Sequence, residues 1–299
     1  MSTLIIGSIQ LGFLYAAMAM GVYISFRILN TADLTVDGSF TLGMAVAAML
    51  TVSGHPYIGV LLAIICGALA GCVTGILQTV MKIHPILASI LTMTGLYSVN
   101  IAIMEGKSNV SLVGQENIFS SFQKLTEIDG NTCKTILPII VCAIVLIIMI
   151  IFYKTRMGLA IRATGDNENM VESSSINANI YKCLGLAIAN ALVALSGALI
   201  TQYQSFSDVG SGSGMVVIGL ASVIIGETLV GKRTVTIGFV SAIVGSVIYR
   251  IIIAIALKFD LFPSYALKII SAIIVVIALI IPNIKQNVSY RRARKREEV

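Results

Sequence analysis

Apolar residues gather in long runs along the chain, with short polar or charged segments between them. A helix of about 20 apolar residues, rising 1.5 Å per residue, crosses the roughly 30 Å hydrocarbon layer of a bilayer. The pattern predicts nine such crossings, at 4–26, 38–54, 57–80, 86–104, 136–153, 181–203, 215–230, 234–256 and 265–284. The runs 38–54 and 215–230 are short and contain Gly and Ser, so each is a candidate for a broken or re-entrant helix.

The composition agrees with a membrane-embedded chain. Hydrophobic residues make up 57% of the sequence and charged residues 11%, which lies outside the range of soluble domains. The crossings leave no room for a separate soluble catalytic domain, so we expect one transmembrane domain over 1–299. Its fold class is all-α and polytopic, with about eight to nine transmembrane helices. The Cys and His residues form no metal-ligand cluster, so we expect neither a metal site nor a bound cofactor.

Basic residues collect on alternate connections, and such an excess marks the cytoplasmic side of a membrane protein. With the N-terminus outside and the C-terminus inside, the inner side holds fourteen basic residues, namely Arg27, Lys82, Lys154, Arg156, Arg162, Lys182, Lys232, Arg233, Lys285, Arg291, Arg292, Arg294, Lys295 and Arg296. The outer side holds four: Lys107, Lys124, Lys134 and Lys258. We expect Arg250 and Lys268 to snorkel near the outer ends of their helices, and the tail 285–299 to contact anionic lipid rather than nucleic acid.

Two polar segments precede the two short runs, ADLTVDGS at 32–39 and SDVGSGSG at 207–214. They lie five crossings apart on opposite sides, which is the spacing of an inverted repeat around a central pathway. Polar groups that face lipid are costly, so polar residues in or beside the spans are expected to face a pathway. The candidates are Asp33, Asp37, Ser39, Asn100 and Asp208, with Gln78, Thr92 and Thr94 as further polar groups. For each, the alternative is a buried hydrogen bond between helices or a helix cap.

One apparent nucleotide site is excluded by its residues. The stretch 226–233, GETLVGKR, has the G-x-x-x-x-G-K spacing of a P-loop, but Arg233 stands where Ser or Thr must hold magnesium. The stretch also follows a membrane segment rather than a strand. If ATP drives this protein, another subunit binds it.

The inner connection 154–180 is predicted to be helical, with charges of both signs. It contains GLAIRA at 158–163 and ends in SSSIN at 173–177. Together with NTADLTVDGSFTLG at 30–43, it resembles the permeases of the branched-chain amino acid and ribose family of ABC importers, in particular a branch often associated with amino-acid-binding lipoproteins. Gly158, Ala160, Arg162, Ala163 and Asn177 fit the family pattern. Two positions depart from the pattern: Met170 stands where Ala is usual, and Ser175 stands where Gly is usual.

This resemblance implies the permease subunit of an ATP-driven importer in the bacterial plasma membrane, which performs no chemistry itself. Its implied partners are a second copy of the chain, cytoplasmic ATPase subunits and an extracytoplasmic substrate-binding lipoprotein. The solute would be an amino acid or a similar small organic molecule. The segment with Gly158, Ala160, Arg162, Ala163, Asp166 and Asn177 would be the coupling helix that docks on the ATPase.

The residues alone support this role, because an amphipathic helix with Met157, Ile161 and Met170 beside charged residues can serve as a rigid handle. A solvated loop is the alternative for the segment. For the whole chain, the alternative is an ion-coupled secondary transporter, which would use carboxylates inside the membrane. The acidic residues here lie at helix ends. A membrane-embedded enzyme would need an acid–base or metal constellation, and the sequence shows none.

Overall fold

The computed structural model describes residues 2–126, 129–231, 233–258, 272 and 276. Eight of its helical segments are long and apolar enough to cross a membrane. They coincide with the first eight crossings that the hydrophobic pattern predicts, which confirms an all-α polytopic membrane protein. The ninth predicted crossing, 265–284, falls almost wholly outside the described residues.

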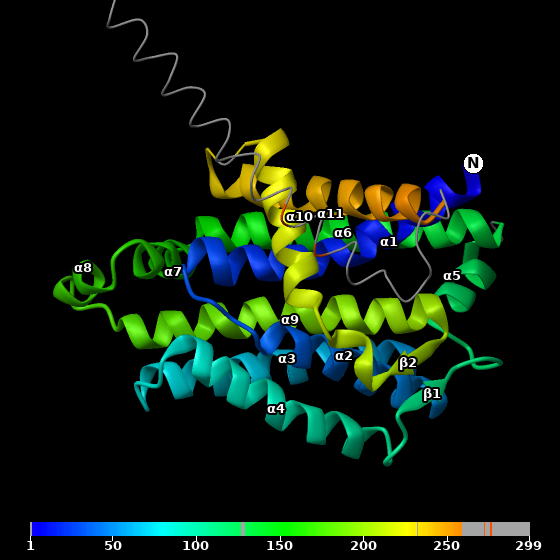
Figure 1. Cartoon of the computed structure of the whole chain (residues 1–299), viewed down its shortest axis with the longest axis horizontal. Helices are drawn as coiled ribbons and strands as arrows, with labels where there is room; N and C mark the ends of the chain where they lie inside the picture. Colours follow the sequence, from blue (N-terminus) through cyan, green and yellow to red (C-terminus); the bar gives the residue numbers. More distant parts are fainter. Residues whose placement is uncertain (1, 127–128, 232, 259–271, 273–275, 277–299) are drawn as a thin grey trace, which may run out of the picture.

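The spans form a bundle in which most helices run side by side (Figure 1). Its first half comprises α1 (Ser2–Tyr23), the π-helix η1 (Ile24–Ile28), α2 (Thr35–Val52), α3 (Pro56–Thr79), α4 (Pro85–Ile103), β1 (Asn109–Ser111) and α5 (Ile118–Thr126). Its second half comprises α6 (Gly130–Lys154), α7 (Arg156–Asp166), α8 (Glu168–Ser173), α9 (Ala178–Gln204), β2 (Phe206–Asp208), the 3-10 helix η2 (Val209–Gly212), α10 (Met215–Leu229) and α11 (Val235–Lys258). Figure 1 shows α7 and α8 at one end of the bundle and α5, β1 and β2 at the other.

Helices α2 and α9 lie at the centre of the bundle. In each of them 78% of the most apolar stretch is buried, compared with 28% in α4 and α6. The outer helices expose large apolar side chains such as Leu61 and Leu69 on α3 and Ile147 and Ile151 on α6. Water would oppose such exposure, whereas lipid tails accept it, so the outer helices are suited to face the bilayer.

Small residues allow α3 to pack closely against α9. The glycines Gly67, Gly71 and Gly75 recur at four-residue spacing on α3 and all face α9. A Cβ atom on Gly71 would collide with the backbone of Leu186, and one on Gly75 would lie 2.7 Å from the Cα of Cys183. The two backbones therefore approach so closely that only glycine fits, as in other membrane helix pairs.

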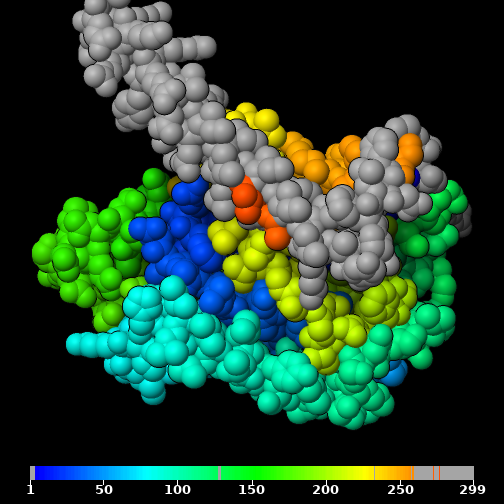
Figure 2. All heavy atoms as spheres, viewed as in Figure 1, coloured from blue at the N-terminus to red at the C-terminus, as the bar shows by residue number. Residues whose placement is uncertain are grey.

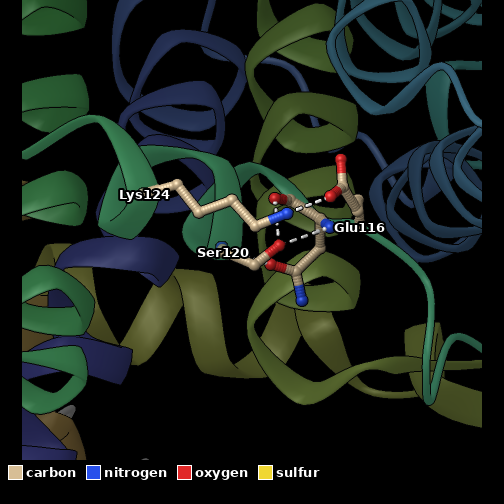
Figure 3. A network of polar contacts seen from close by, with 4 residues as sticks. Glu116, Ser120 and Lys124 are labelled. Carbon is tan, nitrogen blue, oxygen red and sulfur yellow. Dashed lines mark hydrogen bonds and ion pairs between the residues drawn. The ribbon is translucent and has the colours of Figure 1, made fainter. Parts of the chain in front are cut away.

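A small polar layer covers one end of the bundle. Strand β1 pairs antiparallel with β2, with Val110 opposite Ser207, and so ties the connection 105–135 to the segment before α10. Helix α5 begins with a reciprocal cap in which Asn117 and Ser120 each accept a hydrogen bond from the other's backbone N–H (Figure 3). Beside this cap, the Lys124 ammonium pairs with Glu116, and this hydrogen bond and charge hold the pKa of the Glu116 carboxyl below its usual value.

Candidate functional site

Asp37 joins the beginnings of two membrane helices. It lies in the first turn of α2, and its carboxylate accepts hydrogen bonds of 2.8 Å each from the backbone N–H groups of Gly214 and Val216, at the start of α10. Unpaired N–H groups at a helix N-terminus carry partial positive charge, so the carboxylate stabilises them. Gly212 permits this approach, because a Cβ there would collide with the Asp37 carbonyl. The two segments that the sequence suggests as an inverted repeat thus meet at Asp37.

A cavity of about 300 Å³ opens beside this junction. Its walls come from the first turns of α2, the middle of α4, and η2 with its flanking residues. It is lined by Asp37, Gly38, Thr41, Met93, Thr94, Tyr97, Val209, Gly210, Gly212 and Ser213. A cavity of this volume, with mostly apolar walls and a few polar groups, suits a small organic solute.

Two of the predicted pathway residues, Asp33 and Ser39, lie in a buried polar network centred on Asn190 of α9. Asn190 Nδ2 donates to Asp33 Oδ2 at 2.7 Å, and Ser39 Oγ donates to Asn190 Oδ1 at 2.7 Å. All three side chains are fully buried. Asp33 lies in the connection between η1 and α2, where burial raises the pKa of its carboxyl, against the lowering effect of hydrogen bonds from Thr35 and Asn190.

The other two predicted pathway residues hold the backbone near the cavity. Asn100 of α4 donates a 3.2 Å hydrogen bond to the carbonyl of Gly38, and so fixes one wall. Asp208 ends β2 and caps η2 by accepting a 2.7 Å hydrogen bond from the Gly210 N–H. Of the five predicted residues, Asp37 is therefore the one whose side chain frames the cavity directly.

Sequence reasoning missed Asn190, Thr41 and Tyr97. Asn190 could have been found from the sequence, because it is an amide inside an apolar run, as Asn100 is. Thr41 and Tyr97 carry no such signal, because single hydroxyls recur in most of the spans. The structure also places Thr94 on the cavity and Gln78 in a buried position on α3.

The predicted coupling segment forms two short helices, α7 and α8, that project from one end of the bundle (Figure 2). Gly158 and Ala160 are buried and anchor α7, Ala163 is half-buried, and Arg162 and Asp166 are exposed. Asn177 caps α9, because its Oδ1 accepts a 3.1 Å hydrogen bond from the Asn179 N–H.

One detail of the predicted helical handle is wrong. Met170 lies on α8 and not on the same helix as Met157 and Ile161, and Ile161 is fully buried against the bundle. Gly185 of α9 leaves room for Ile161 and Leu29 to pack there. The large apolar side chains exposed on this segment include Met157, Leu159 and Met170, each more than half exposed.

The coupling segment contacts the end of α1 backbone to backbone. A Cβ on Gly165 would collide with the Ile28 carbonyl, at the last residue of η1. On the same π-helix, the Arg27 guanidinium pairs with Glu227 in the last turn of α10, and the Glu227 side chain is only 8% exposed. A π-helix within a membrane span often marks a functional position. Here it joins α7 to α10.

Arg250 is predicted to snorkel toward the end of its helix, but its side chain lies against α1. Its guanidinium carbon lies 3.6 Å from the centre of the Tyr15 ring on α1, and its Nε atom is buried.

These features define a polytopic membrane protein with a cavity of about 300 Å³ between its helices and a projecting helical segment at one end. Residues 4–279 match the model of a family described as branched-chain amino acid transport system / permease component, and the chain belongs to this family. It is thus a permease component of an ABC-type importer for small solutes, a multi-pass protein of the bacterial plasma membrane. Such membership implies ATPase and binding-protein partners in general.

Several relatives align over nearly the whole chain. A tyrosine transport system permease protein of Clostridioides difficile (strain R20291) is 40% identical over 92% of this chain and 89% of its own length. The ribose import permease protein RbsC of Escherichia coli (strain K12) is 26% identical, covering 91% of this chain and 83% of its own. The fructose import permease protein FruF of Bifidobacterium longum (strain NCC 2705) is also 26% identical, over 94% and 79%. No solved structure matches the chain significantly.

Proposed function

We propose that this chain is the transport subunit of an ATP-driven importer that moves an amino acid into the cell. Two copies form the pathway, cytoplasmic ATPase subunits supply the energy, and a substrate-binding lipoprotein delivers the solute from outside. The N-terminus lies outside and the C-terminus inside. Among relatives, the one with 40% identity is named for tyrosine, whereas those named for sugars have 26%, which supports an amino acid as the solute.

The observation that carries the proposal is the shape of the α7–α8 segment. It projects from the bundle, exposes Met157, Leu159 and Met170, and places Arg162 and Asp166 in solvent. Apolar side chains surrounded by charges on a protruding surface are typical of a protein–protein contact. Its buried side packs on η1 and α9, so a partner that binds this segment acts directly on the membrane helices.

The test is a double charge reversal in the coupling segment, Arg162→Glu with Asp166→Arg. An interfacial charged pair that loses its partners costs about 2–5 kcal/mol, or roughly 30-fold or more in affinity, whereas a solvated charge costs under about 1 kcal/mol. We expect the variant to insert and fold but to copurify little ATPase. The matched control is the reversal of the exposed pair at the other end of the bundle, Glu105→Lys with Lys107→Glu, which should leave ATPase recovery unchanged.

Uptake of labelled L-tyrosine by cells provides the second arm. Depleting ATP while the proton gradient is held should abolish uptake in the unsubstituted protein. Full ATPase recovery and full uptake in the Arg162 and Asp166 variant would contradict the docking role. Uptake that persists without ATP would favour an ion-coupled secondary transporter.

A further inference from the structure

Arg250 is a cation within a membrane span, without an anionic partner in the described part of the chain. It lies eight residues before the end of α11, and none of the ion pairs among the described residues includes it. Its buried Nε–H donates no hydrogen bond there. A charged side chain inside a bilayer is costly unless it is paired or serves a pathway, so an Arg within a predicted span that has no anionic partner among the described residues indicates a function.

Close packing against α1 holds the part of α11 that carries this cation. Just before it on α11, Ser246 Oγ donates a 2.9 Å hydrogen bond to the Gly12 carbonyl of α1. A Cβ on Gly12 would lie 2.7 Å from the Cα of Val247, so the two backbones are in close contact. Tyr249 is buried to 1% exposure. The α11 backbone that carries Arg250 is therefore held against α1.

The Tyr15 ring covers one face of the Arg250 guanidinium. A cation over a ring is stabilised through the face of the guanidinium plane, while the N–H donors point outward within that plane. Tyr15 is itself stacked on Phe40, with ring centres 6.0 Å apart and planes 9° from parallel. Phe40 lies one turn after Asp37, so the stack joins Arg250 to the part of α2 that frames the cavity.

We propose that Arg250 binds the carboxylate of the transported solute as the solute crosses the membrane. The in-plane N–H donors of a guanidinium match the two oxygens of a carboxylate, which an ammonium group cannot match in the same way. The inference rests on the proposed importer function and narrows its substrate class to carboxylates, such as amino acids. Neutral sugars, the solutes in the names of two of the 26% relatives, have no group that would complete this site.

The experiment uses the complete transporter with its binding protein in proteoliposomes, with labelled L-tyrosine and labelled D-ribose as probes. The variants are Arg250→Gln, which removes the charge, and Arg250→Lys, which keeps the charge but not the planar pair of donors. Lys258→Gln is the matched control, because Lys258 is an exposed cation on the same helix. For each, the KM and kcat of uptake, the basal ATP hydrolysis and the thermal unfolding midpoint are measured.

We expect L-tyrosine to be transported in preference to D-ribose. Loss of a charge-assisted hydrogen-bonded pair predicts a KM raised about 10- to 100-fold in both Arg250 variants, with basal ATP hydrolysis retained and Lys258→Gln unchanged. Should Arg250→Gln fail to fold, Arg250→Lys still decides, because an unchanged KM in that variant overturns the proposal. Transport of D-ribose but not L-tyrosine also overturns it, yet leaves the importer function standing. If uptake proves independent of ATP, the importer function fails, while the KM comparison still tests Arg250.

Discussion

Asn190 shows how a single buried amide can connect three parts of the chain. It hydrogen-bonds Asp33 before α2 and Ser39 within α2, and its Nδ2 also donates to the Leu186 carbonyl on its own helix at 3.0 Å. In hydrocarbon no water is present to replace these partners, so each group depends on the others. The network therefore fixes the start of α2, and with it the Asp37 carboxylate that holds α10.

We expect Asn190→Leu to destabilise the protein markedly. The substitution leaves two buried polar side chains without their partner, at about 1–3 kcal/mol each, so the loss should be at least about 2 kcal/mol. The thermal unfolding midpoint in detergent should fall by several degrees. Asn179→Leu is the control on the same helix, since Asn179 is exposed and should shift the midpoint little. Equal midpoints for the two variants would show that the network contributes nothing.

At the scale of elements, α10 is fastened at both of its ends. Its first turn is held by Asp37 on α2, and its last turn by the pair between Glu227 and Arg27 on η1. Because η1 also contacts α7 at Gly165, a displacement of the coupling segment has a short, continuous route to α10 and so to the cavity. Energetic coupling between sites is carried by such contiguous packing and ion pairs.

Breaking the pair between Arg27 and Glu227 should uncouple ATP hydrolysis from uptake. In Arg27→Gln, Glu227 keeps its charge but loses its partner. Because one side chain of this pair is exposed and the other is buried, the loss should cost about 1–2 kcal/mol of interaction free energy. We expect the uptake per ATP hydrolysed in proteoliposomes to fall about 5- to 30-fold. The exchange Arg27→Glu with Glu227→Arg should recover part of the ratio, and Lys124→Gln, which breaks an exposed pair, should not change it. An unchanged ratio in Arg27→Gln would exclude this relay.

For the molecule as a whole, the sequence located the spans well and their contacts poorly. Long apolar runs identify helices because their length alone matches the bilayer. The eight described spans begin and end within a few residues of the prediction, apart from the fifth and the seventh, which each begin six residues earlier, at Gly130 and Val209. Contacts such as Asp37 with Val216 join residues far apart in the chain, and no local pattern encodes them. Likewise, amphipathicity marked α7 as a helix but could not tell that Ile161 faces the bundle, nor that Tyr15 would cover Arg250.

The orientation of the molecule in the membrane can be tested at the two ends of the bundle. The exposed residues Lys107 and Lys124 lie at the end with α5 and β1, and Asp166 lies at the end with α7 and α8 (Figure 1). The positive-inside rule predicts that the second end lies in the cytoplasm, because the described connections at that end carry more basic residues than those at the other. In a background whose five cysteines are replaced, Lys107→Cys and Lys124→Cys should react with an impermeant maleimide on intact cells, whereas Asp166→Cys should not. All three should react after detergent solubilisation, which controls for accessibility. Reaction of Asp166→Cys on intact cells would show that the orientation is opposite to the proposed one. The proposed ATPase contact would then lie outside the cell, where no ATP is supplied.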